Sequence, residues 1–184
     1  MKTLDTIQKR KSPETFLSTP ISTNDMQTIV EAGLYAPIFG KIHFTVINDK
    51  EMINKINIVT LEMMKNSGNE FAKAMANQPG YNATRNAPTV VVLSALGGND
   101  ENGFNMANVS CAAQNMLLAA TELGIGSRFA MGPIMAFSQE SILQMLHLPD
   151  GYTPLVMVLL GNIDDSFEKR HKEADNISYI DAQL

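Results

Sequence analysis

The stretch that decides the fold is residues 105–124, NMANVSCAAQNMLLAATELG. Apolar residues occupy most positions around the axis of a helix here, and only Gln114, Thr121 and Glu122 form a narrow polar edge. A helix that is apolar nearly all round is buried on nearly all sides. In a chain of 184 residues, this pattern predicts a core helix that also meets a second subunit. Gly124 marks the end of the predicted helix.

Two runs with almost no polar residue predict the centre of a sheet. Residues 89–93, TVVVL, and 155–160, LVMVLL, leave no face for water, which is typical of strands covered on both sides. The short β-branched run 44–47 predicts another strand. Apolar residues at helical spacing predict helices over 3–9, 23–35, 51–66 and 69–77, and a later helix capped by Ser138. Strands separated by helices indicate an α+β fold or a three-layer α/β sandwich.

The composition excludes several classes of protein. The formal charge is −5 and the pI about 5.1, whereas nucleic-acid binders more often carry a basic face. The one cysteine, Cys111, cannot form an intramolecular disulfide or a metal cluster. The sequence opens on no apolar signal region, and no apolar run approaches the roughly 20 residues of a membrane span. We therefore expect a single cytoplasmic domain over residues 1–184, with no metal, no membrane and no nucleic acid as partner.

Basic residues cluster near both ends of the chain. Arg10-Lys11-Ser12 follows the first predicted helix, and Lys169-Arg170 follows the last predicted strand. In an acidic protein, these clusters could meet on one anion, since guanidinium groups match the oxygens of a phosphate. The alternative is two separate solvated surface runs.

The order of these and other landmarks resembles the nitroreductase family of FMN enzymes nearly from end to end. The most specific part is 113–120, AQNMLLAA, with the following segment 123–127, LGIGS. The remaining landmarks, in the family's order, are Arg10-Lys11-Ser12 with Phe16, 32–37 (AGLYAP), 43–47 (HFTVI), 87–92 (APTVVV), Gly161 and Lys169-Arg170.

The resemblance implies that FMN is the cofactor and that the basic clusters hold its polar end. Arg10 and Arg170 would bind the FMN phosphate, with Lys169 nearby. Lys11 and Ser12 would reach the ribityl chain or the pyrimidine edge of the ring. Positive charge at Lys11 would then favour the reduced flavin.

The resemblance also implies an intertwined homodimer, with a small, mostly antiparallel sheet and two FMN sites at the subunit interface. Pro37-Ile38-Phe39 would come from the other subunit and line the flavin. Ala130-Met131-Gly132 would pass near the flavin ring and offer it backbone N–H groups. The helix over 105–124 would form the dimer core. Near the end of the chain, Ile177, Tyr179 and Ile180 either dock on a partner subunit or belong to a frayed end.

Four departures from the family's pattern concern the flavin site. Glu14 stands where the family usually has a basic residue, which removes one positive contact near the cofactor. The segment 38–42 is shorter than usual and lacks the common Ser-Ser-x-Asn-x-Gln-Pro-Trp motif. Asn108 replaces a common Asp, and Arg128-Phe129 replaces a frequent Cys-Trp.

The function implied is an FMN-dependent oxidoreductase that takes hydride from NAD(P)H and reduces a small acceptor, such as a nitroaromatic or a quinone, by a ping-pong mechanism. We nominate no catalytic side chain, because the flavin carries the chemistry. Glu14 and the short 38–42 segment also fit a flavin-binding carrier or sensor with little turnover. Flavin enzymes with a different reaction and a cofactor-free structural dimer are further alternatives.

Overall fold

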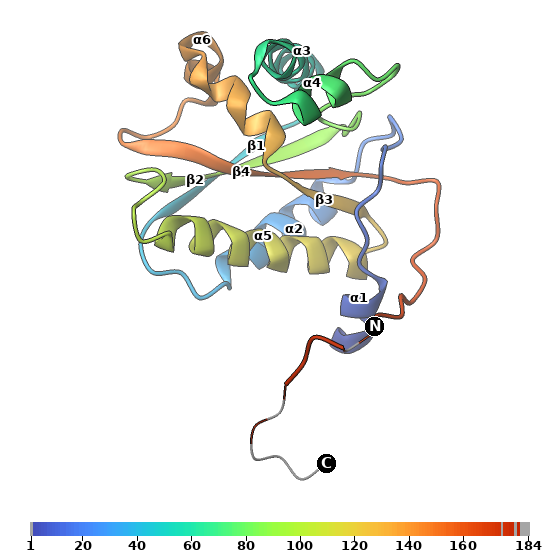
Figure 1. The fold of residues 1–184 in the computed structure, drawn as a ribbon. Helices are drawn as coiled ribbons and strands as arrows, with labels where there is room; N and C mark the ends of the chain where they lie inside the picture. The colour runs from blue at the N-terminus through green and yellow to red at the C-terminus, as the bar shows by residue number, and fades with distance from the viewer. Residues whose placement is uncertain (1, 174, 179, 181–184) are drawn as a thin grey trace.

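The computed structural model describes residues 2–173, 175–178 and 180 as one antiparallel sheet with helices on both faces (Figure 1). The strands lie in the order β1-β2-β4-β3, and all neighbours are antiparallel. The elements are α1 (Thr3–Lys9), α2 (Thr23–Leu34), β1 (Ile42–Ile47), α3 (Lys50–Asn66), α4 (Glu70–Ala76), β2 (Thr89–Leu96), α5 (Phe104–Glu122), β3 (Gly126–Ala130), α6 (Glu140–Leu143) and β4 (Tyr152–Gly161). Short 3-10 helices over Gly132–Ser138 and Gln144–Leu146 flank α6.

The helices form two layers, one on each face of the sheet. Helices α2 and α5 cover one face, and α3, α4 and α6 lie over the other (Figure 1). This arrangement confirms the predicted three-layer α+β fold. Side chains cap two of the predicted helices. At the start of α2 the Ser22 hydroxyl accepts from the Asp25 N–H at 3.0 Å, and at the start of α3 the Asp49 carboxylate accepts from the Met52 N–H at 2.7 Å.

Strand β2 lies at the centre of the sheet, as predicted from residues 89–93. Its side chains alternate between two apolar clusters: Val91 and Leu93 pack with α5, while Val90 and Val92 pack with α3. Each of these four side chains is fully buried. A strand covered on both faces explains why the sequence shows a continuous apolar run rather than an alternation.

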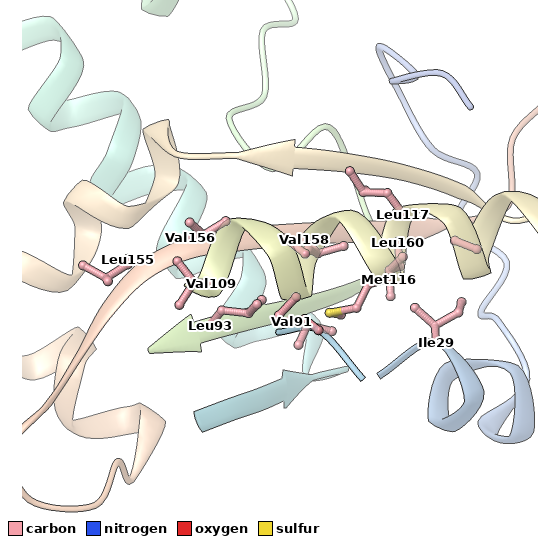
Figure 2. Close-up of a cluster of buried hydrophobic side chains, with 14 of the residues drawn as sticks. Ile29, Val91, Leu93, Val109, Met116, Leu117, Leu155, Val156, Val158 and Leu160 are labelled. Carbon is pink, nitrogen blue, oxygen red and sulfur yellow. The ribbon is translucent and has the colours of Figure 1, made fainter. Parts of the chain in front are cut away.

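Helix α5 is the core helix that the sequence predicted. Met116 and Val109 are fully buried against Val91 and Val158 of the sheet and Ile29 of α2 (Figure 2). The helix exposes Cys111 and Gln114 on its remaining side. Its predicted contact with a second subunit therefore stays a prediction about this exposed side.

Two local features differ from the sequence-based expectation. Strand β3 was not predicted, because its five residues include Arg128 and follow a glycine-rich turn. The cap predicted at Ser138 is wrong: Gln139 precedes α6, and no side chain caps the helix. The Ser138 hydroxyl instead donates to the Met135 carbonyl at 2.9 Å, because residues 132–138 form a 3-10 helix that already uses this position.

After β4 the chain has no further helix or strand within its described residues. It turns back past α1, where the Arg170 N–H donates to the Gln8 carbonyl at 3.1 Å. Ile177 and Ile180 are exposed, and Tyr179 lies outside the described residues. Docking of this tail on a partner subunit stays a prediction.

Candidate cofactor-binding site

The two basic clusters predicted from the chain ends lie beside each other. Arg10 follows the last residue of α1, and the segment after β4 runs back to α1, where Arg170 pairs through its backbone with Gln8. The Lys169 Nζ lies 2.6 Å from Asp5 Oδ1 on α1. The structure therefore brings Arg10, Lys169 and Arg170 close to one end of α1, and their shared binding of an anion stays a prediction.

The electrostatics of this place, which we call the anion clamp (Arg10, Lys169 and Arg170), favour a negative ligand. Burial of the Arg10 guanidinium lowers the pKa of Arg10, and the positive charge of Arg170 lowers it further. Within the described part of the chain, neither arginine forms an ion pair. Two guanidinium groups that repel each other without a carboxylate between them would gain from a shared dianion such as a phosphate monoester.

Lys11 and Ser12 follow Arg10 in sequence, and their side chains bind different groups: Ser12 binds Arg10, and Lys11 binds the segment after β4. The Ser12 hydroxyl accepts a hydrogen bond from Arg10 Nη1 at 3.1 Å. The Lys11 ammonium pairs with the Asp165 carboxylate and the Ser166 carbonyl, and it lies 5.5 Å from the centre of the Phe167 ring. The hydrogen bond from Lys11 lowers the pKa of Asp165. Lys11 is thus tied to the segment after β4.

A pocket of about 510 Å³ opens between β3, α3 and α4. This volume falls within the range of small-molecule sites. The predicted ring-contacting residues Ala130, Met131 and Gly132 all form part of its wall. The rest of the wall is mostly apolar and is made by Thr60, Met64, Phe71, Ala72, Met75, Tyr81, Ala83, Arg85, Arg128, Phe129, Pro133 and Met135.

Two arginines of this wall share one carboxylate. Arg128 Nη1 lies 3.0 Å from Glu14 Oε1, and Arg85 Nη1 lies 3.0 Å from Glu14 Oε2. Arg128 also donates to the Pro13 carbonyl at 2.9 Å. The hydrogen bond from Arg128 and the charges of both arginines lower the pKa of Glu14, against a smaller opposing effect of burial. We call these three side chains the Arg85–Glu14–Arg128 triad.

Arg85 is a site residue that the sequence analysis did not identify. It adopts φ = 57° and is followed by Asn86 at φ = 59°, so two residues with side chains occupy the left-handed region in succession. Such conformations cost on the order of 1–3 kcal/mol each and concentrate at functional sites. Asn82 stabilises the turn, because its Oδ1 accepts from the backbone N–H groups of Thr84 and Asn86. The only sequence signal was Asn86 itself, a residue type that tolerates this conformation.

Pro37, Ile38 and Phe39 lie between α2 and β1 and do not line the pocket of their own chain. Asn108 of α5 holds this segment: its Oδ1 accepts from the Phe39 N–H at 3.0 Å, and its Nδ2 donates to the Phe39 carbonyl at 2.5 Å. The Phe39 side chain is 80% exposed. The segment is therefore fixed in place while presenting an aromatic ring outward.

The described residues contain no group of His, Cys, Asp and Glu side chains able to hold a metal ion. None of the helices that the structure describes is both long enough and apolar enough to cross a membrane.

Comparison with known proteins places this geometry in context. The model of the nitroreductase family matches residues 7–162. A protein of Archaeoglobus fulgidus named as an NADH dehydrogenase/NAD(P)H nitroreductase is 27% identical over 178 residues, which is 94% of this chain and 91% of the relative.

Solved structures share the fold. A nitroreductase with bound FMN from Desulfitobacterium hafniense superposes with a TM-score of 0.88 at 24% identity, covering 98% of this chain and 99% of the other. A nitroreductase with bound FMN from Bacteroides fragilis gives a TM-score of 0.84, also at 24% identity, covering 98% and 99%. The α+β fold expected from the sequence is therefore confirmed.

Proposed function

Because the chain belongs to the nitroreductase family, we propose that it is an FMN-dependent oxidoreductase that uses NAD(P)H to reduce a small acceptor. Membership in this family of oxidoreductases bears out the resemblance seen in the sequence. The NAD(P)H and FMN named for its relatives support the choice of reductant and cofactor.

The proposal rests on the anion clamp and the apolar pocket, which the segment 10–14 connects, because Arg128 of the pocket wall donates to the Pro13 carbonyl at 2.9 Å. Arg10 and Arg170 suit a phosphate, because they are adjacent and neither is paired to a carboxylate in the described chain. The pocket suits a flat aromatic ring system, because most of its wall is apolar. A mononucleotide with a phosphate at one end and a ring at the other fits this arrangement.

The chain's own residues bind and orient the cofactor. When bound, FMN would accept hydride from the reduced nicotinamide and pass reducing equivalents to the acceptor. Arg10 and Arg170 would hold the phosphate, with Lys169 held beside them by Asp5. The 3-10 helix over Gly132–Ser138 begins at the pocket wall. Pro133 has no N–H, and the Ile134 N–H donates to the Met131 carbonyl at 3.1 Å. The Gly132 N–H is therefore the group at this helix start that would donate to the ring. The apolar wall would exclude water from the reacting face.

We propose that the active form is a homodimer in which Pro37-Ile38-Phe39 of one subunit completes the pocket of the other. The bidentate hydrogen bonds of Asn108 fix this segment, and its aromatic ring is exposed. The neighbouring end of α2 also exposes Leu34 and Tyr35. Exposed apolar groups gathered on ordered backbone are typical of a protein interface.

The absorption spectrum of the purified protein with added FMN tests the proposal. We expect a stoichiometric flavin complex that NADH or NADPH bleaches under anaerobic conditions. A quinone should then restore the oxidised spectrum, and steady-state rates with varied NAD(P)H and quinone should give the parallel lines of ping-pong kinetics. Binding of FMN with hardly any NAD(P)H oxidation would instead identify a carrier or sensor. Failure to bind FMN would refute the proposal.

A further inference from the structure

We propose that Arg85 and Arg128, held by Glu14, supply the positive charge that acts on the flavin ring in this protein. This inference rests on the proposed function, since it concerns the pocket in which the ring would lie. It assigns a cofactor-tuning role to two side chains that the sequence analysis did not include among the binding residues.

The position of the two arginines supports this role. They are the only charged side chains among the described residues that line the pocket, and the same wall contains Ala130, Met131 and Gly132. Their side chains are only 16% and 24% exposed, so water screens their charge less than that of a surface arginine. A ligand that fills the pocket would remove more of this screening.

Both guanidinium groups are held in fixed positions. Arg85 lies over the Tyr81 ring, with its Cζ 4.8 Å from the ring centre. Its backbone carbonyl accepts from the Phe16 N–H at 3.0 Å, which connects the strained turn to the N-terminal segment. Arg128 extends from β3 and is fixed by the Pro13 carbonyl and the Glu14 carboxylate. Side chains that are held in place before the ligand binds lose little conformational entropy on binding.

The alternative source of positive charge is Lys11, and its contacts lead elsewhere. The Lys11 ammonium is paired with Asp165 and does not line the pocket. Glu14, by contrast, brings a negative charge to the two arginines of the pocket wall. The triad has two positive charges and one negative charge, so its net charge of about +1 remains positive at neutral pH. Arg128 and Arg85 thus outweigh the charge of Glu14.

The two kinds of charge in the triad have opposite expected effects on the cofactor. The arginines should strengthen FMN binding and favour the reduced ring, which carries more negative charge than the oxidised ring. Glu14 should oppose both effects, because it neutralises one arginine. A triad with a purely structural role would behave differently, since removal of either partner would break the same ion pairs and weaken binding in the same direction.

The experiment compares Arg128→Ala, Arg85→Ala and Glu14→Gln with the unchanged protein. Lys55→Ala is the matched control, because Lys55 is an exposed cation on α3 outside the pocket wall. The readouts are the FMN dissociation constant, from quenching of flavin fluorescence, and the midpoint potential of the bound flavin. Circular dichroism of each variant checks that it is folded, and Arg128→Lys tests rescue by charge alone.

We expect Arg128→Ala to weaken FMN binding by about tenfold or more, the scale of a hydrogen bond to a charged group. Binding of reduced FMN should weaken tenfold more than that of oxidised FMN, which lowers the two-electron potential by about 30 mV. Arg85→Ala should act in the same direction. Glu14→Gln should raise the potential, Arg128→Lys should restore part of it, and Lys55→Ala should change neither readout.

Three results would overturn the inference while leaving the proposed function intact. One is normal FMN binding and potential in both arginine variants. Another is a fall in potential in Glu14→Gln as well as in Arg128→Ala, which would indicate a structural role. A raised KM for anionic acceptors without any change in potential would likewise overturn it, since the arginines would then bind the acceptor. Failure of the unchanged protein to bind FMN would instead refute the proposed function.

Discussion

Asn108 uses both polar atoms of its amide to hold the backbone of Phe39. The residue is buried, and its Oδ1 accepts while its Nδ2 donates. The carboxylate of an aspartate at this position could only accept. The amide therefore suits the short 38–42 segment of this chain, because it satisfies both the N–H and the carbonyl of one residue.

Asn108→Asp should lower the free energy of unfolding by about 1–3 kcal/mol, because the Phe39 carbonyl loses its donor and a carboxylate is buried beside it. Urea denaturation of the apoprotein measures this loss. The control is Asn54→Asp, which makes the same change at an exposed position of α3. Equal stabilities of the two variants would contradict the role given to Asn108.

Arg10→Ala should weaken FMN binding by about 1.5–3 kcal/mol, the scale of a hydrogen bond between charged groups. Fluorescence titration with FMN measures the change. Lys172→Ala removes a charge from a nearby exposed position and should have little effect. If Arg10→Ala retains full FMN affinity, Arg10 does not bind the phosphate.

The lowered pKa of Glu14 predicts a pH dependence of stability. A carboxyl whose pKa is lower in the folded state than in the unfolded state stabilises the fold above its unfolded pKa of about 4.3, and this contribution disappears as the pH falls through the folded pKa. The Glu14 side chain is 75% exposed, so screening limits the contribution to below about 1 kcal/mol. Urea denaturation of the apoprotein should show Glu14→Gln less stable at pH 7, with the difference shrinking as the pH falls below about 4.3. A difference that does not shrink on acidification would show that the ion pairs are not its cause.

At the scale of elements, β3 and β4 pack closely against Phe16 of the segment between α1 and α2. Gly126 and Gly161 face each other across the two strands. A Cβ on Gly161 would lie 2.6 Å from Pro88 Cδ and 3.1 Å from Phe16 Cβ. Phe16 belongs to the segment that also contains Arg10, so this packing helps to place the anion clamp.

Gly161→Ala should therefore cost about 1–3 kcal/mol of stability, the scale of overpacking in a core, because the proline ring cannot easily move aside. Thermal unfolding with calorimetry measures this cost. Gly68→Ala is the control, since a Cβ there meets no heavy atom within 4 Å. An unchanged melting temperature for Gly161→Ala would show that Pro88 relaxes freely.

The sequence predicted the elements that have a sustained apolar pattern. Helix α5 and strand β2 each have such a pattern, and its length distinguishes a helix from a strand. Strand β3 has no such pattern, because Arg128 reaches the pocket and Gly126 packs under Ile163. Its pairing with β4 depends on tertiary contacts that a local pattern does not contain.

Only part of the candidate site could be predicted from the sequence. The convergence of Arg10 with Arg170 followed from the resemblance and from the chemistry of anion binding. Arg85 could not be predicted in this way, because its position depends on a strained turn and on Glu14, which lies 71 residues earlier in the chain. The contact of Lys11 with Asp165 likewise joins residues distant in sequence.

At the scale of the whole molecule, the proposed homodimer completes the pocket with a second subunit. Phe39, Tyr35 and Leu34 are exposed near one another in sequence, and the 37–39 segment does not reach the pocket of its own chain. A monomer would leave these apolar groups in water and the flavin ring open to solvent. We therefore expect dimerisation and FMN binding to be coupled.

Phe39→Asp should shift the protein towards the monomer and weaken FMN binding at the same time, because a charge would be buried at the interface. Light scattering after size-exclusion chromatography measures the mass, and fluorescence titration measures FMN affinity. Ile58→Asp, at an exposed position on α3, should alter neither. A monomeric unchanged protein that binds FMN with full affinity would contradict the proposed assembly.

The return of the chain to α1 after its last strand has a consequence for how this architecture can vary. Residues 164–170 add no helix or strand to the fold, yet they bring Lys169 and Arg170 to Arg10. Shortening the polypeptide after Ile163 would leave every helix and strand in the sequence while deleting two of the three residues of the anion clamp. Changes in residues 164–170 would thus alter the affinity for an anion without altering the sequence of any helix or strand.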